Sequence, residues 1–347
     1  MDVIARARTS AFHVVKRAGG FEAIASSAWR RARLLVLCYH GVSLGDEHRW
    51  RPALYVSPQR LAERLQAIRG GGYSVLPLGD ALRLLYRGDL PERTVVLTFD
   101  DGGHDFHASA YPLLQENGYP ATVYLRTDYC GHGYPVFLLM LSYLLWKAAG
   151  VDTTMPLPTG PALRLDTRTP NGRARTGDAI RSYAKSEALS LSTRDELLAR
   201  LAQALDIDYG SLRSQRLLQI MSPEEVSRLS RNGIDFQLHT HGHHSPRSEA
   251  EYRLQITQNR RRIQEITGQT PTHFCYPSGE HAAEFLPWLR AEGVVSATTC
   301  VPGIARPSDN PLLLPRFVDT TPRSSIDFEA WLSGAGALAA RAPRYNV

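Results

Sequence analysis

Lysine is scarce in this chain. Of its 40 basic residues only Lys16, Lys147 and Lys185 are lysines, so arginine supplies almost all of the positive charge. The formal net charge is +6, and the arginines are spread along the sequence apart from short runs at 30–33 and 260–262. Such runs can attract anionic lipid or nucleic acid. Because no aromatic platform interleaves them, we interpret them as solvated surface and expect no nucleic-acid partner.

Cysteine is sparse as well. Cys38, Cys130, Cys275 and Cys300 are far apart in the sequence, and no two of them have the spacing of a CxxC motif. This spacing excludes a zinc knuckle and a paired redox motif. We therefore expect four buried free thiols.

Long apolar runs are missing too. The longest, at 136–146, is interrupted only by Ser142 and is too short for a bilayer, which needs about 20 residues. The first thirty residues contain no apolar segment followed by a small-residue cleavage site. We therefore expect a cytoplasmic protein and leave open a peripheral association with the membrane surface. The sequence does not indicate an oligomeric state.

The sequence does contain short apolar runs that alternate with helical patterns. Strands buried on both faces have this continuous apolar character, and strands that alternate with helices form a largely parallel sheet with covering helices. The runs predict strands at 34–39, 73–76, 94–99, 121–125, 234–238, 272–276, 294–299 and 312–318.

The pattern divides the chain into regions. We expect an amino-terminal helical lead-in at 1–33, a catalytic domain at 34–320 and a carboxy-terminal tail at 321–347. Within the domain, residues 129–217 depart from the alternation and read as a helical and loop insertion. Its middle, at 152–178, is rich in Pro, Gly, Thr and Arg and predicts a long loop.

Polar side chains follow several of the predicted strands at their carboxyl ends. They are His40, the pair Asp100 and Asp101, the segment HTHGHH at 239–244, and the turn after Tyr276. Parallel α/β sheets and barrels place their functional sites at this end of the strands. We therefore expect these four features to meet.

The histidine-rich segment changes how the aspartates are interpreted. Alone, Asp100 and Asp101 could equally be a turn or helix-capping pair. His239 and His243 lie four residues apart, a spacing that puts two imidazoles on one face of a helical turn. Two histidines and one carboxylate form a catalytic metal set that suits zinc and other divalent metals. The alternative is a solvated His-rich loop that binds metal adventitiously.

A metal held in this way would support hydrolysis. It lowers the pKa of bound water from about 15.7 toward about 7, and a neighbouring carboxylate then accepts the proton. Asp100 is the candidate base and Asp101 the candidate ligand. The turn at 277–279 could offer the backbone N–H of Ser278 to an oxyanion. His40 is the candidate proton donor to a leaving amine, although a lone His after a strand is more often structural.

Three segments carry a resemblance to a known family. LTFDDG at 97–102, HTHGHH at 239–244 and FCYPSG at 274–279 resemble, in matching order, the motifs of the polysaccharide deacetylases with the NodB homology domain, carbohydrate esterase family 4. The resemblance covers about 34–128 and 218–320. It implies a distorted (β/α) barrel of about seven parallel strands, with the insertion left unmatched.

The family's motifs also imply roles for individual residues. The first motif implies Asp100 as the base and Asp101 as a metal ligand. The second implies His239 and His243 as the other ligands, supported by Thr240. The metal implied is zinc, with cobalt and nickel as alternatives.

The third motif implies one wall of the site. In the family this segment contacts the substrate and supplies the backbone donor, which implies Tyr276, Pro277 and Gly279 as substrate-binding residues and Ser278 as the donor.

The chain departs from the family pattern in two places. Family members commonly have an Arg two residues before the Pro of the third motif, where this chain has Cys275, and Arg316 in LLLPRF at 312–317 is the candidate replacement. The usual late Leu-x-His segment is not visible. CYHG at 38–41 resembles members whose acid follows the first strand, which favours His40 as the acid.

These features predict a metal-dependent hydrolase that removes N-acetyl groups from an amino-sugar glycan or glycoconjugate and releases acetate. The substrate could be a lipid- or nucleotide-linked precursor of a cell-surface polysaccharide. One alternative is hydrolysis of a non-sugar amide or an O-acetyl ester at the same site. Another is a non-catalytic glycan-binding module, which is disfavoured because the base and all three ligands are present.

Overall fold

A closed barrel of parallel strands forms the centre of the molecule. The computed structural model describes residues 3–340, with side chains from residue 7 onward. The barrel strands are β1 (Leu35–Tyr39), β5 (Thr94–Asp101), β6 (Ala121–Leu125), β9 (Ile234–Leu238), β10 (His273–Cys275), β11 (Ser296–Pro302) and β12 (Leu314–Val318). β1 pairs in parallel with both β5 and β12, which closes the ring. The predicted distorted (β/α) barrel of about seven parallel strands is confirmed.

Three shorter strands extend this arrangement. β4 (Ser74–Val75) pairs with the start of β5, and β2 (Gly41–Val42) pairs with β3 (Tyr55–Val56) directly after β1. The segment between β2 and β3 includes the short helix α4 (Glu47–Trp50).

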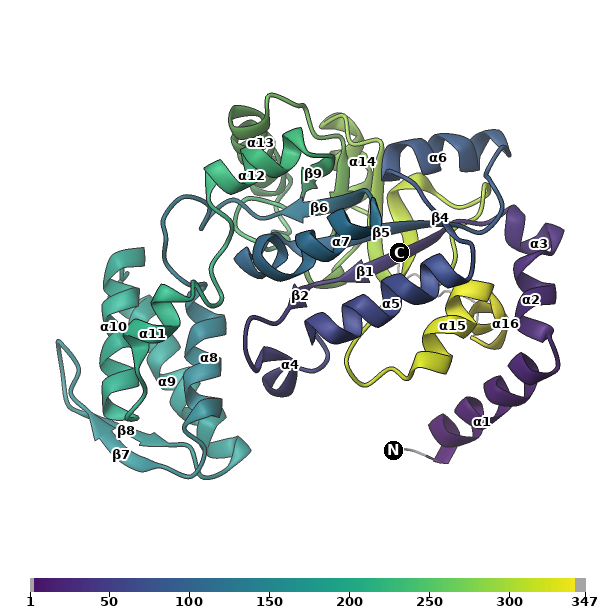
Figure 1. Cartoon of the computed structure of the whole chain (residues 1–347). Coiled ribbons are helices and arrows are strands. Elements are labelled where there is room, and N and C mark those ends of the chain that lie inside the picture. Colours follow the sequence, from purple (N-terminus) through teal and green to yellow (C-terminus); the bar gives the residue numbers. More distant parts are fainter. Residues whose placement is uncertain (1–2, 341–347) are drawn as a thin grey trace.

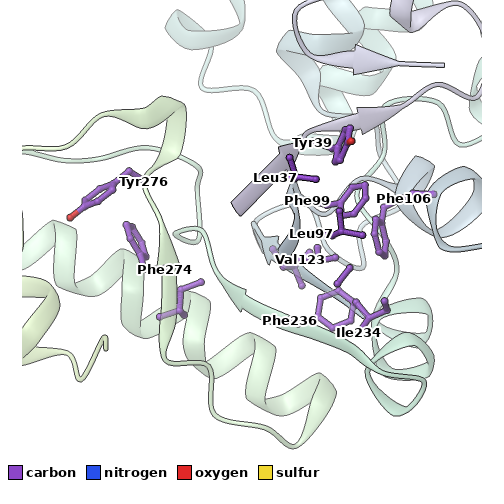
Figure 2. Close-up of a cluster of buried hydrophobic side chains, with 14 of the residues drawn as sticks. Leu37, Tyr39, Leu97, Phe99, Phe106, Val123, Ile234, Phe236, Phe274 and Tyr276 are labelled. Atoms are coloured by element: carbon purple, nitrogen blue, oxygen red, sulfur yellow. The ribbon is translucent and has the colours of Figure 1, made fainter. Parts of the chain in front are cut away.

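The strands are buried on both faces, as their apolar runs predict. Along β1, Leu35, Leu37 and Tyr39 pack in the main hydrophobic cluster beneath the helices, whereas Val36 belongs to a second cluster. Figure 2 shows part of the main cluster, in which residues of β1, β5, β6 and β9 lie together. With apolar outer faces, the strands can direct polar side chains inward.

Helices cover the barrel. They are α5 (Pro58–Gly70), α6 (Leu78–Arg87), the π-helical turn η1 (Phe106–Ala110), α7 (Tyr111–Asn117), α12 (Pro223–Arg231), α13 (Glu249–Thr267) and α14 (Phe285–Ala291). The Ser57 side chain caps α5 by accepting the Arg60 N–H. Ser222 and Glu225 form a capping box at the start of α12. Local signals in the sequence therefore fix where these helices begin.

The insertion forms a separate lobe beside the barrel (Figure 1). It contains α8 (Phe137–Lys147), β7 (Asp152–Met155), β8 (Leu163–Asp166), α9 (Pro170–Ser186), α10 (Leu191–Ala204) and α11 (Tyr209–Ser214), and most of its apolar side chains share a cluster of their own. The expected loop at 152–178 instead forms the β7–β8 hairpin and the first half of α9. Met155 and Leu165 bury the hairpin's inner face, and Thr169 caps α9.

Both ends of the described chain pack on the same side of the barrel. The lead-in forms α1 (Val3–Arg17), α2 (Gly20–Ala25) and α3 (Ala28–Arg31), and residues after 321 form α15 (Ser325–Ser333) and α16 (Ala335–Ala339). Phe12 and Phe21 pack against Ile326 and Ala330. Residues 341–347 of the predicted tail lie outside the described residues.

Arg30, in the first basic run, is not surface charge. It is buried, and its guanidinium donates to the carbonyls of Leu332, Arg33 and Thr94. This arginine therefore joins the lead-in to the barrel and is not free to attract a ligand. Within residues 3–340, none of the helices combines the length and apolar character needed to cross a membrane.

Candidate metal and active site

Three of the predicted residues meet at one point at the carboxyl end of the barrel. Asp101 ends β5, and His239 and His243 follow β9. The Nε2 atoms of His239 and His243 lie 3.4 and 3.0 Å from the same carboxylate oxygen, Oδ1 of Asp101. These are the three residues that the sequence predicts as metal ligands.

No hydrogen-bond donor satisfies the Asp101 oxygen at this point. His239 Nδ1 lies 2.8 Å from the carbonyl oxygen of Cys275, so it carries the proton, and Nε2 presents a lone pair to Asp101. Asp101 Oδ1 is buried and has no hydrogen-bond partner. A buried carboxylate oxygen that faces two imidazole nitrogens without a hydrogen bond is costly unless a cation satisfies it. The donor set and its orphaned oxygen fit a divalent metal such as zinc.

Backbone strain is concentrated at the same place. Four non-glycine residues here have a positive φ: Asp101 (69°), Thr240 (58°), His243 (54°) and Ser278 (56°). This conformation costs about 1–2 kcal/mol for an L-residue. Such strain persists where the surrounding structure imposes it, and it clusters at functional sites.

Asp100, next to the ligand, is paired with a buried cation. Arg316 Nη1 and Nη2 donate to Asp100 Oδ1 and Oδ2 at 2.8 and 2.7 Å, and Arg316 Nε donates to the carbonyl of Thr299 at 2.9 Å. Burial raises the pKa of Asp100, but the Arg316 guanidinium outweighs it and holds that pKa well below its usual value. Asp100 is therefore held as a carboxylate. Arg316 reaches it past Cys275, the position where the family commonly has its Arg.

His40 lies on the other side of Asp100, at the end of β1. Its Nε2 is 3.7 Å from Asp100 Oδ2, and one fifth of its side chain is exposed, so it can reach solvent or a substrate. The structure thus brings His40 next to Asp100, as the sequence predicts.

The turn η2 (Pro277–Gly279) forms a wall of the site. Tyr276 is fully buried and its hydroxyl donates to the Leu312 carbonyl at 2.9 Å. Gly279 has φ of 70°, and a Cβ there would lie 3.0 Å from Cβ of Cys300. Ser278 is exposed and lines the cavity above the ligands, whereas Pro277 and Gly279 do not line it. Tyr276 also lines this cavity, whereas Pro277 and Gly279 shape the turn that presents Ser278.

The sequence reasoning missed Asn259, on α13. It is fully buried; its Oδ1 accepts the backbone N–H of His239, and its Nδ2 donates to Leu125 O and Thr127 Oγ1. Asn259 thereby links the loop that carries His239 to β6. One asparagine in a polar helix gives no sequence signal of such a role.

A second group of side chains with metal-binding atoms lies away from this site. His104 and His107 face Glu225 Oε1, with Nδ1–Oε1 distances of 3.1 and 3.4 Å. Arg216 contacts the same oxygen and Arg228 contacts His107. Because two guanidinium groups already supply positive charge here, we interpret this group as a structural charge network.

The sequence can now be compared with known proteins. The sequence profile of the family described as "Polysaccharide deacetylase" matches residues 87–148 and 176–296, which together are more than half of the chain. The chain belongs to the polysaccharide deacetylase family. The matched residues include Asp100, Asp101, His239, His243 and Asn259, but not His40 or Arg316.

Individual relatives in the family align over shorter stretches. YxkH of Bacillus subtilis, named as a polysaccharide deacetylase, is 31% identical over 112 residues, which is 31% of this chain. The poly-beta-1,6-N-acetyl-D-glucosamine N-deacetylase of Escherichia coli K12 is 32% identical over 100 residues, 28% of this chain. The chain spans only 38% and 14% of the length of these two curated relatives.

Solved structures of deacetylases share the fold over most of the chain. The Streptococcus pyogenes deacetylase PplD superposes with a TM-score of 0.54 at 18% identity, covering 84% of this chain and 93% of that one. IcaB from Ammonifex degensii gives 0.54 at 17% identity, covering 88% and 97%. These similarities show the barrel fold.

Proposed function

We propose that the chain is a metal-dependent hydrolase that removes N-acetyl groups from an amino-sugar glycan or glycoconjugate and releases acetate. The observation that carries this proposal is the meeting of His239 Nε2, His243 Nε2 and the orphaned Asp101 Oδ1 beside a carboxylate held ionised by Arg316. The E. coli relative named for N-deacetylation of poly-N-acetylglucosamine supports the choice of an N-acetylated sugar.

Asp101, His239 and His243 would hold the metal, most simply zinc, with cobalt and nickel as alternatives. When bound, such a metal supplies Lewis-acid polarisation of the amide carbonyl and acidifies water. Asp100 accepts the proton of the attacking water, and Arg316 keeps it available as a base. The N–H of Ser278 donates to the developing oxyanion. His40 gives a proton to the departing amine.

The test is release of acetate by the purified chain after chelation and reloading with zinc, cobalt or nickel. N-acetylglucosamine oligosaccharides and glycoconjugates serve as substrates, with an O-acetylated sugar and a non-sugar acetamide as comparison. We expect acetate and a free amine only from the N-acetyl sugars and only with metal. Acetate from the ester or the non-sugar amide alone would contradict the proposal.

A further inference from the structure

The cavity above the candidate active site does not end at the barrel. It has a volume of about 1480 Å³ and continues from His40, Asp101 and Ser278 into the insertion, where α8, α9 and Leu191 and Arg194 of α10 line it. This is larger than most small-molecule sites, which are about 300–1,000 Å³. A substrate held at the metal site would therefore extend over the lobe.

The α8 side of this cavity is aliphatic. Leu138, Leu141 and Leu145 lie three and four residues apart and so share one face of the helix, and all three line the cavity. Leu138 is 52% exposed, and it adjoins the other two leucines of this face, so the exposed apolar surface is contiguous. An apolar chain would cover this face.

The facing helix α9 supplies positive charge. Arg173, Arg181 and Lys185 line the cavity at helical spacing. Gly177 lies between them, where an added Cβ would be 3.4 Å from Leu145 Cδ1, so the two helices approach closely. The aliphatic face and the cationic face therefore line the same cavity.

Four cations of the cavity have no acidic partner within the described part of the chain. They are Arg51, Arg173, Lys185 and Arg194. Arg194 lies over the ring of Phe137 at 5.7 Å, and its buried Nε has no hydrogen-bond partner. An unsatisfied buried guanidinium N–H in a cavity that also holds an unpaired ammonium is matched by an anion, and phosphate is one of the anions that arginine binds bidentately.

The cavity has few neutral hydrogen-bonding side chains. No Asn, Gln, Glu or Thr is among its lining residues within the described chain. Outside the catalytic pair, its acids are Asp128 and Asp178, which are paired with Arg126 and Arg181. The polar lining beyond the barrel is therefore mostly cationic, which suits an anionic group better than a neutral one.

We propose that the substrate is an anionic amphiphile, in which the N-acetylated sugar is joined through a phosphate-like group to an apolar chain. The anionic group contacts Arg194 and the cations of α9, and the chain lies along the leucine face of α8. This inference rests on the proposed function for the sugar end only. The leucine face favours an acyl or prenyl chain over a nucleoside as the third part.

Binding of dodecyl phosphate, kept below its micelle concentration and followed by calorimetry, tests the inference without any turnover. We expect saturable binding about tenfold or more tighter than that of dodecyl maltoside, inorganic phosphate or UDP-N-acetylglucosamine. Equal or tighter binding of the sugar nucleotide would overturn the apolar assignment. Binding to anionic vesicles without saturable binding of monomeric dodecyl phosphate would assign the surface to membrane attachment and also overturn it.

Matched variants localise the site. Leu138→Asp and Lys185→Glu should each weaken dodecyl phosphate binding by about tenfold or more. Leu254→Asp, on α13 at 53% exposure, and Arg175→Glu, on α9 outside the cavity, should leave it unchanged. Equal effects of the cavity and control variants would refute the assignment.

Turnover then separates this inference from the proposed function. N-acetylglucosamine linked to a prenyl phosphate should release acetate with a higher kcat/KM than the same sugar phosphate without the chain. Equal kcat/KM values would overturn the inference and leave the proposed function standing. Dodecyl phosphate binding with no acetate from any N-acetyl sugar would refute the proposed function and leave the amphiphile site standing.

Discussion

Asp100 and Asp101 are neighbours in the chain, yet they have unlike partners. Asp100 continues the inward direction of β5 and meets Arg316, whereas the left-handed backbone of Asp101 aims its carboxylate at the two imidazoles. The pair thus supplies one carboxylate balanced by a cation and one that lacks a hydrogen-bond donor. A base and a ligand need these different surroundings.

The first prediction separates those two roles. Asp100→Asn should lower acetate release by about 10²–10⁴-fold because the base is lost, while the bound zinc stays unchanged. His239→Ala should lose both zinc and activity. Zinc content by mass spectrometry, read beside acetate release, checks this. Full activity of Asp100→Asn would show that another group is the base.

The second prediction concerns the buried pair. Arg316 lowers the pKa of Asp100, so Arg316→Met should raise it, and the acid limb of the pH–rate profile should move to higher pH. In the wild type, the pair's stabilisation is present above the unfolded pKa of about 3.9 and is lost as pH falls below it. Breaking the pair should cost about 3–5 kcal/mol of unfolding free energy at pH 7. Arg316→Lys, which keeps the charge, should shift the limb less. An unmoved limb in Arg316→Met would contradict this.

At the scale of elements, helix α13 positions a ligand without touching the metal site itself. Asn259 accepts the N–H of His239 and donates to the end of β6, so it fixes where β9 delivers its imidazole. Mutation of supporting groups of this kind typically weakens metal binding about 10–100-fold.

The third prediction follows. Asn259→Leu should weaken zinc binding by about 10–100-fold, because the His239 loop loses its anchor while all three ligands remain. Competition with a chromophoric chelator measures the affinity. Gln258→Leu, on the exposed face of the same helix, is the control and should bind zinc normally. Normal zinc affinity in Asn259→Leu would show that the His239 loop keeps its position without Asn259.

The strands were predictable from the sequence because each is a short apolar run buried on both faces. All seven barrel strands and β4 lie within or within a few residues of their predicted ranges. Functional sites of parallel barrels lie at the carboxyl ends of the strands, and this predicted that His40, Asp100 and His239 lie close together. The positive φ of Asp101 and the contacts of Asn259 could not be predicted, because both follow from packing between distant segments. The β7–β8 hairpin was missed because Pro and Gly hide its alternation.

On the scale of the whole molecule, the barrel and the lobe have different cores. The main cluster lies beneath the barrel helices, whereas α8, α9 and α10 bury their own cluster together with residues near β3. Regions with separate cores can open separately.

The fourth prediction is that a substitution in one core leaves the stability of the other core unchanged. Leu144→Ala, fully buried in the lobe, should cost about 2–5 kcal/mol and raise hydrogen exchange in α8 and α9 while zinc binding persists. Leu97→Ala, fully buried in the barrel, should weaken zinc binding as well. Equal loss of protection in the barrel strands of Leu144→Ala would show a single cooperative unit.

The closure of the barrel joins the first strand to the last, with Leu37 beside Phe317. Arg316 therefore reaches Asp100 only after β12 has been synthesised and has closed the ring. A nascent or truncated chain that ends before β12 contains Asp101, His239 and His243 but leaves Asp100 without a counter-charge and its ring open. On the proposed function, such a chain would carry its metal ligands before its base is held ionised, and it would gain hydrolytic activity only once β12 is in place.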